Sequence, residues 1–174
     1  MDFTKKDARG AAEVAQFCHL RDQDTGKHLH DDDGTPVGVM VLGAMARSVQ
    51  EALRNDARSK LQDTKGKSKS EQNRALEDIQ KDLVTSASKL TVGFQNVQRC
   101  ETDANGKIIY LDDGVTPKNQ WNAKAPEDCA WFYDLNMFST ASLLNPKDDE
   151  WQGLSFAQQV LAFSNEASNY LGNA

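Results

Sequence analysis

The front of the chain constrains the fold most, because a turn-rich ribbon there runs directly into a helical segment. Residues 13–22 alternate in the two-residue period of a strand, and residues 37–42 form a second apolar strand after Pro36. Two turn signals, DQDTGK and DDDG, lie between them. Asp side chains bond nearby backbone amides and Gly adopts positive φ, so both sequences favour tight turns. The pattern predicts an antiparallel β-ribbon over residues 13–42.

Helices are expected over the middle of the chain, residues 44–97. A polar run, TKGKSKS, predicts a loop that divides two helices, and Ser70 can cap the second, which ends or kinks at Gly93. Apolar residues recur every three or four positions in both, as in amphipathic helices. The first face comprises Met45, Val49, Ala52 or Leu53, Ala57 and Leu61. The second comprises Leu76, Ile79, Leu83, Val84, Ala87 and Leu90, continued by Phe94 and Val97.

Residues 98–130 change character and are predicted to be a loop or a β-hairpin insertion. Turn residues are frequent, and residues 107–111 are a short strand candidate. The ANGK sequence favours a hairpin turn, because Asn-Gly suits the positive-φ positions of a type I′ turn. Residues 131–137 are predicted to be a strand or irregular, and no internal repeat is evident in the sequence.

The chain is expected to close with two helices over residues 139–172. Ser139 can cap a short helix over residues 140–144, which stops before a proline. A final helical region follows over residues 147–169, with Gly172 placed to end it. Its broad apolar face comprises Trp151, Leu154, Phe156, Val160, Phe163, Ala167, Tyr170 and Leu171.

Together these elements predict a single domain over residues 1–174. It is expected to be mainly α, with a small antiparallel β-element near the N-terminus (α+β), and its helices are expected to pack as a bundle. Hydrophobic residues make up 39% of the chain, which is enough for one core in a chain of this length.

The charge of the chain argues against nucleic acid and membrane as partners. The formal net charge is -6, whereas nucleic-acid binding depends on Lys and Arg side chains that neutralise phosphates. The basic cluster KGKSK is too short for such a site. No apolar run reaches the roughly 18 residues that span a bilayer, and the N-terminus does not resemble a signal peptide. Three widely spaced cysteines favour reduced, structural thiols in a cytoplasmic protein.

One stretch of the sequence partly matches a calcium-binding loop. In residues 101–112, Asp103, Asn105 and Asp112 stand at the spacing of oxygen ligands, and Gly106 stands at the sixth position. However, Glu occupies the first position, Asp occupies the twelfth, and no helix is expected on either side. The Asn-Gly hairpin turn explains the same residues, so we predict no calcium site here.

Other metal and nucleophile patterns are equally incomplete. Two turns carry an acidic cluster that can be explained by the preference of Asp for turns: Asp22, Asp24, Asp31, Asp32 and Asp33. Structural zinc requires four ligands, commonly with paired cysteines, and the chain offers only scattered candidates: Cys18, His19, His28 and His30. Neighbouring strand residues point to opposite faces, so His19 cannot activate Cys18. We therefore predict no catalytic residue, no cofactor and no metal ligand.

The order of the motifs resembles the tail assembly chaperones of long-tailed bacteriophages. The resemblance is carried by the turn DQDTG, the apolar strand VGVMVLG, the helix ARSVQEALRNDARSK and the final segment QVLAFSNEASNYL. It covers most of the chain except residues 98–130, which are longer than in that family. The middle also departs from the pattern, since Phe94 stands where relatives usually carry a Trp.

The resemblance implies a binding protein rather than an enzyme. Such a chaperone binds the tape measure protein, keeps its long apolar helices soluble and helps to recruit tail tube subunits. It self-associates, acts in the cytoplasm of the infected host and is absent from the mature virion. Amphipathic helices can offer an apolar groove to a partner helix. We therefore hypothesise a partner-binding surface on the final helix, formed by Trp151, Phe156, Val160, Phe163 and Tyr170.

Two alternatives stay open at this stage. The same apolar face can be core instead of interface, which is the default for an amphipathic helix. The protein can also be another small phage protein, such as a head-tail connector or an anti-defence inhibitor, or, less favoured, a metal-dependent enzyme that uses the Asp-rich turns.

Overall fold

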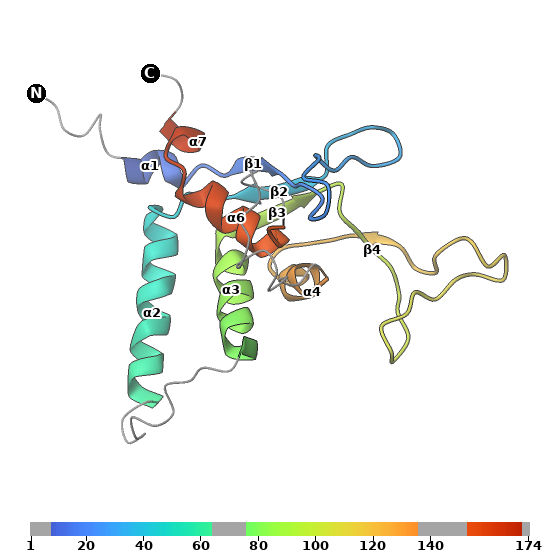
Figure 1. Cartoon of the computed structure of the whole chain (residues 1–174). Coiled ribbons are helices and arrows are strands. Elements are labelled where there is room, and N and C mark those ends of the chain that lie inside the picture. The colour runs from blue at the N-terminus through green and yellow to red at the C-terminus, as the bar shows by residue number, and fades with distance from the viewer. Residues whose placement is uncertain (1–7, 64–75, 136–152, 172–174) are drawn as a thin grey trace, which may run out of the picture.

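The computed structural model describes residues 8–63, 76–135 and 153–171. In the described residues the fold is mixed α/β, with helices arranged around two small antiparallel sheets (Figure 1). The predicted helical bundle is therefore wrong. One source of the error is the segment Thr91–Gln95, which we expected to be helical and which pairs as a strand.

A three-stranded antiparallel sheet lies at the centre of the fold, in the order β1-β2-β3. Its strands are β1 (Gln16–His19), β2 (Gly38–Val41) and β3 (Thr91–Gln95). The first two lie inside the ribbon predicted over residues 13–42 and pair antiparallel. The third joins the other side of β2 after two long helices, so β2 is the central strand and buries Val39 and Val41 completely.

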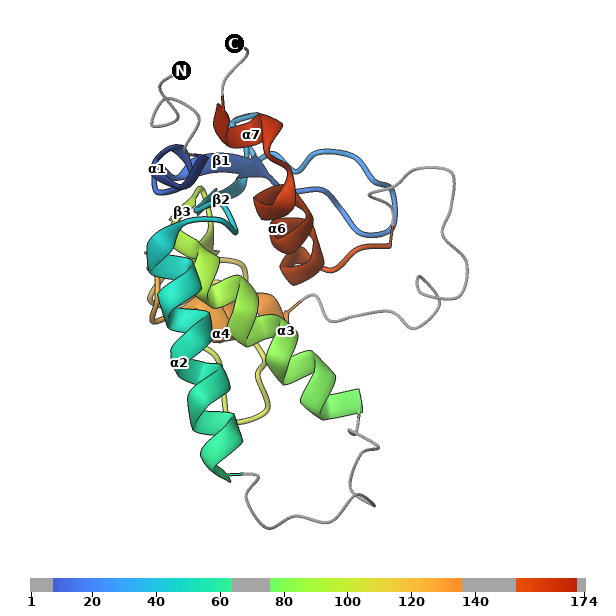
Figure 2. The same ribbon diagram turned by 90° about the vertical axis from the view of Figure 1, so that its left-hand side faces the viewer.

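Six helices surround the sheet in the described part of the chain. They are α1 (Ala8–Ala12), α2 (Arg47–Asp63), α3 (Leu76–Leu90), α4 (Cys129–Asp134), α6 (Phe156–Asn165) and α7 (Ser168–Leu171). Helices α3, α4 and α6 pack against one another and on the sheet, whereas α2 stands beside α3 (Figure 2). The core lies between the sheet and helices α3, α4 and α6.

The helical region predicted over residues 44–97 extends too far, because α3 ends at Leu90. Thr91 begins β3 directly after α3, because Thr91, Val92 and Phe94 are β-branched or aromatic and favour strands. Pairing with β2 then gives the N–H and C=O groups of β3 their hydrogen-bond partners. Gly93 lies inside β3 rather than at a helix end, and Phe94 and Val97 extend a sheet rather than a helical face.

Helix α4 replaces the strand or irregular segment predicted over residues 131–137. Cys129, Phe132 and Tyr133 are buried, and this three- and four-residue spacing is helical. Phe132 is the centre of an aromatic cluster, with ring centroids 5.0 Å from Phe94 and 5.2 Å from Phe156. Aromatic packing against α6 and β3 therefore fixes this short helix.

In the described residues, the final helical region is divided into two helices, α6 and α7. Helix α6 begins with a capping box, in which Ser155 Oγ accepts from Gln158 N–H and Gln158 Oε1 accepts from Ser155 N–H. The chain leaves the helix at Glu166, which is extended, before the short α7. The helix predicted over residues 140–144, the start of the final helical region and Gly172 lie outside the described residues.

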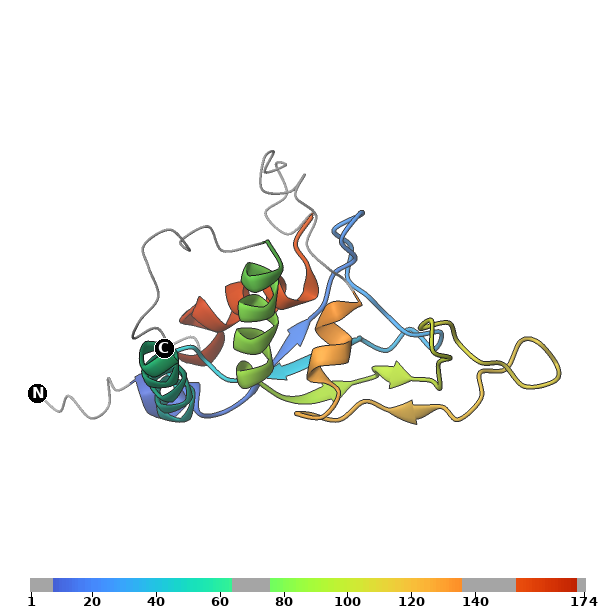
Figure 3. The ribbon, with the colours of Figure 1, turned by 90° about the horizontal axis from the view of Figure 1, so that it is seen from below.

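A β-arm over residues 98–122 projects away from the helices (Figure 3). Its base is the second sheet, in which β4 (Gln98–Arg99) pairs with β5 (Trp121–Asn122). The segment predicted as a strand, residues 107–111, forms only isolated bridges, at Ile108 and Tyr110. The arm lies within the range predicted as a loop or a β-hairpin insertion, residues 98–130, and its main pairing is at the base rather than at the tip.

The arm repeats a unit that already occurs near the N-terminus, although the sequence shows no obvious repeat. We call residues 20–37 repeat A and residues 101–118 repeat B. In each, three short segments bond in a closed ring of main-chain hydrogen bonds between 2.8 and 3.3 Å. The ring joins Leu20, Leu29 and Val37 in repeat A, and Glu101, Ile109 and Lys118 in the same three places of repeat B.

The turns of the two repeats also match. Gly26 and Gly106 occupy equivalent positions with φ of 69° and 78°, and Gly34 and Gly114 follow with φ of 77° and 70°. An Asp carboxylate accepts from backbone amides in each turn, as the sequence predicted for the first repeat. The ANGK turn differs from the predicted type I′ form, because Asn105 has no positive φ and only its glycine does.

Gly38 provides a test of the sheet register. A Cβ at Gly38 would lie 2.3 Å from the Cys18 carbonyl oxygen, whereas a Cβ at Gly93 would approach Met40 no closer than 3.8 Å. We expect Gly38→Ala to lower the free energy of unfolding by about 1–3 kcal/mol, because the backbone of β1 must move. Gly93→Ala is the matched control and should be nearly neutral in urea unfolding. Equal effects of the two substitutions would contradict the register.

Candidate partner-binding surface

An apolar pocket lies where β2 leads into α2, beside α1 and the α6–α7 connection. Its volume is about 120 Å³, and its lining consists of Ala12, Gly43, Ala44, Met45, Ser164, Asn165, Ala167 and Tyr170. Main-chain bonds hold the walls together: Gly43 N–H donates to the Ala12 carbonyl and Ala44 N–H to the Ser164 carbonyl, both at 2.9 Å. The pocket is thus built from three separate parts of the chain.

Small residues create the space, and Met45 borders it. A Cβ at Gly43 would lie 2.7 Å from the Cβ of Ala12, so only glycine permits this approach. The sequence predicted Met45 on the buried face of a helix. In the structure it precedes α2 and is 60% exposed, whereas Val49, from the same predicted face, is buried. Leu53 on α2 is also exposed.

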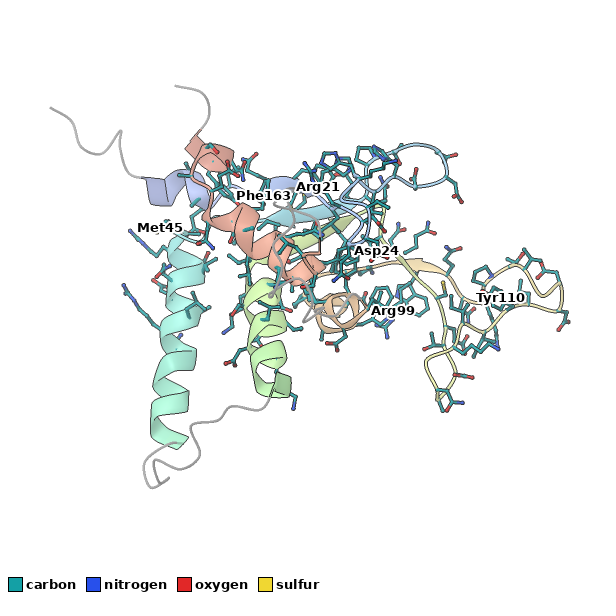
Figure 4. The ribbon with its side chains drawn as sticks, in the orientation of Figure 1. Arg21, Asp24, Met45, Arg99, Tyr110 and Phe163 are labelled. Atoms are coloured by element: carbon teal, nitrogen blue, oxygen red, sulfur yellow. The ribbon has the colours of Figure 1, made fainter. Side chains whose placement is uncertain are left out.

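The five residues predicted to bind a partner separate into different environments. Val160 is fully buried, and Phe156 stacks on Phe132 with ring centroids 5.2 Å apart. Tyr170 lines the pocket, and its hydroxyl donates to the Val41 carbonyl at 3.3 Å. Phe163 packs its ring against Tyr170 at 6.0 Å (Figure 4). Trp151 lies outside the described residues. Of the four described members of the predicted surface, Val160 and Phe156 belong to the core and Tyr170 lines the pocket.

The three histidines considered as zinc ligands do come together. The rings of His19 and His28 stack at 4.2 Å, and His30 meets His19 edge-on at 4.9 Å. Stacked, nearly parallel rings direct their in-plane nitrogen atoms in parallel rather than toward one point. Among the described residues, no group of three or more His, Cys, Asp or Glu side chains is placed to hold a metal ion.

The acidic residues of the turns are used in local hydrogen bonds. Asp31 Oδ1 accepts from Thr35 N–H at 2.8 Å, and Asp103 Oδ1 accepts from Asn105 N–H at 2.8 Å and Lys107 N–H at 2.9 Å. Hydrogen bonds from Thr35, first from its hydroxyl, hold the pKa of Asp31 below its usual value. The partial calcium loop over residues 101–112 is therefore one turn of repeat B rather than a gathered set of ligands.

The buried thiols and phenol are held in their neutral forms. Burial raises the pKa of Cys18 to about 12 and that of Cys129 to about 11. Burial also raises the pKa of Tyr133, whose hydroxyl bonds that of Thr91. A protonated thiol is a poor nucleophile, so neither cysteine is prepared for covalent chemistry. All three cysteines are free of disulfides.

Arg99 fastens the β-arm to α4. Its guanidinium forms an ion pair with Asp128 at 2.5 Å and lies over the rings of Trp121 and Trp131, 5.7 Å and 5.0 Å from their centroids. The same carboxylate accepts from Lys124 N–H at 2.9 Å. A guanidinium close to two indole rings is attracted to both ring faces. These contacts tie the base of the arm to α4.

Sequence reasoning did not identify the pocket or the Arg99 contacts. Ala12, Gly43 and Ser164 are small residues without a motif, and they meet only after three distant segments have folded. The two tryptophans around Arg99 offered a weak signal, because aromatic residues in a polar, turn-rich segment require a packing partner.

Comparisons with protein-family models, with curated proteins and with solved structures found no significant match for this chain. Within the described ranges, no helix combines the length and the apolar character of a membrane span.

The histidine cluster predicts how stability depends on pH. The pKa of His28 lies below 6.5. The largest cause is the loss of hydration on burial, and the charges of Arg21 and His19 lower the pKa further. The folded protein therefore binds this proton less tightly than the unfolded chain, and stability is complete above pH 6.5 and falls as the pH drops through the folded pKa. We expect the melting temperature to decrease from pH 7 to pH 5, and to decrease less in His28→Gln.

Calorimetry across this range separates the histidine from the carboxylates. Asp22, Asp31 and Asp113 also have lowered pKa values, but their contribution is lost only below about pH 4, where free aspartate is protonated. An identical slope for wild type and His28→Gln between pH 7 and pH 5 would contradict the assignment to His28.

Proposed function

We propose that the chain is a tail assembly chaperone that binds the tape measure protein of a long-tailed bacteriophage. The observation that carries this proposal is the apolar pocket with Met45 exposed at its border. An apolar cavity of ~150 Å³ accepts a benzene-sized group, so a pocket of about 120 Å³ suits one large apolar side chain of a client. The order of turn, strand and helix in the first 63 residues also supports the proposal.

The pocket suits a helical client. Helices that dock in apolar grooves do so through single side chains spaced along one face. Here one such side chain enters between α1 and the α6–α7 connection, while Met45 and Leu53 contact its neighbours. Methionine adapts its shape to different partners, which favours a chaperone that must accept many similar positions on a long helix.

The proposed cycle requires binding without chemistry. The chaperone covers apolar surface of the tape measure protein in the host cytoplasm, self-associates along it, helps to recruit tail tube subunits and leaves before the virion is mature. This role uses no nucleophile, cofactor or metal, and we propose that the protein is not an enzyme. The protonated, buried Cys18 and Cys129 are consistent with that role.

A substitution at Met45 tests the proposal. Met45→Asp places a charge beside the apolar pocket, and a client that buries this position must then remove the charge from water. We expect the amount of co-expressed tape measure protein that stays soluble to fall about tenfold, which corresponds to a loss of about 1.4 kcal/mol in binding. The melting temperature should hardly change, since the side chain is 60% exposed.

Leu135→Asp is the matched control, because Leu135 is 61% exposed and lies at the end of α4, away from the pocket. This variant should keep the client soluble. Two results would contradict the proposal: wild-type chain that does not keep the tape measure protein in solution, or a Met45→Asp variant that does so as well as wild type.

A further inference from the structure

The two repeats have equivalent outer edges, but only one of them is covered. In repeat A, Arg21 lies opposite His28 in an antiparallel pair of the kind that exchanges no hydrogen bonds. The N–H and C=O of Arg21 therefore point outward, away from His28. Thr102 has the same place in repeat B, opposite Ile108. The outward main-chain groups of Arg21 and Thr102 are therefore the positions to compare.

The edge of repeat A is closed by residues 153–159, which comprise the segment before α6 and the first turn of that helix. The side-chain amide of Gln159 imitates a strand: its Oε1 accepts from Arg21 N–H and its Nε2 donates to Arg21 C=O, both at 2.8 Å. Gly153 N–H donates to Gln23 C=O at 2.8 Å, and the Gln23 side chain returns a bond to Gly153 C=O. One short segment thus satisfies the whole edge.

The edge of repeat B has no such partner within the described residues. No group there bonds the N–H or C=O of Thr102, or the C=O of Ala104, which follows the turn aspartate as Gln23 does in repeat A. The arm also exposes apolar side chains where the first repeat is polar or packed. They are Ile108, Tyr110, Leu111 and Val115, exposed by 39% to 77%. Figure 4 shows Tyr110 on the projecting arm.

The charges of repeat B indicate which occupant fits. Four acidic residues, Glu101, Asp103, Asp112 and Asp113, exceed two basic ones, Lys107 and Lys118. If two copies paired through Thr102, the Glu101 of one would lie opposite the Asp103 of the other, and like charges directly opposite destabilise a strand pair. An extended segment with Lys or Arg in those places would be attracted instead.

We propose that repeat B docks an extended, basic segment of the tape measure protein, which pairs with the Thr102–Ala104 edge as the Gly153–Gln159 segment pairs with Arg21–Gln23. This inference rests on the proposed function. The added strand supplies main-chain hydrogen bonds, and the exposed Ile108 and Tyr110 contact its apolar side chains. The pocket and the arm then hold two different parts of one client.

A pair of substitutions at Thr102 isolates the main-chain contribution. Thr102→Pro and Thr102→Val both remove the hydroxyl, but only proline removes the N–H. With the full chain co-expressed with the tape measure protein, we expect Thr102→Pro to retain about fivefold less client on an affinity resin, the effect of one hydrogen bond. Thr102→Val should retain as much as wild type. Unchanged amide resonances of Gly106 and Gly114 show that the arm stays folded.

A second variant decides the case in which proline disrupts the arm. Ile108→Ser combined with Tyr110→Ser removes exposed side chains only and should also lower client retention, whereas Val92→Ser, an equally exposed site on β3, should not. A photo-reactive residue in place of Tyr110 should cross-link to a Lys- or Arg-containing segment of the client. A cross-link to a second copy of this chain would overturn the inference.

The outcomes distinguish this inference from the proposed function. If wild-type chain retains no tape measure protein, both are contradicted. If wild type retains the client and the folded Thr102→Pro variant, or the serine double variant, retains as much, repeat B is not its docking site while the proposed function stands. Equal losses in Thr102→Pro and Thr102→Val would show a side-chain contact and overturn the pairing of main-chain edges.

Discussion

The buried side chain of Gln159 connects the two ends of the chain, and the rest of the fold depends on it. It is fully buried, and its amide bonds the N–H and C=O of Arg21, 138 residues away, as well as the Leu154 carbonyl at 3.1 Å. An unpaired amide in this place would be costly, so repeat A and α6 can only assemble together. Because α6 also packs on α3 and β2, this contact fixes the position of the ribbon relative to the core.

The same backbone unit serves two purposes in this molecule. Repeat A is joined to the core through Leu20, which is fully buried, and its edge is closed by Gln159. Repeat B has Glu101 at the position equivalent to Leu20, and Arg99 attaches it to α4. Shared turns therefore preserve the shape, while the side chains at the ring positions decide whether the unit is buried or displayed.

Local chemistry was readable from the sequence, and long-range pairing was not. The Asp-Gly turns of repeat A and helix α2 follow from short patterns, since their causes lie within a few residues. Strand β3 was missed because its reason for being a strand is β2, which is distant in the sequence. The repeat was missed because its equivalent positions share backbone geometry rather than side chains, as Leu20 and Glu101 show. The pocket was missed because its small lining residues carry no motif.

The proposed complex holds its client by two modest contacts rather than by one extensive interface. A pocket for one side chain and an edge for one short strand each bind weakly, because a single hydrogen bond or buried side chain contributes little after ordering is subtracted. Because both would belong to one chain, binding at one contact raises the effective concentration at the other. Release then needs only one of them to be displaced before the other dissociates. The ion pair of Arg99 with Asp128 bears on this proposal, because it ties the base of the arm to the N-terminal end of α4 and so restricts how far repeat B moves relative to the pocket.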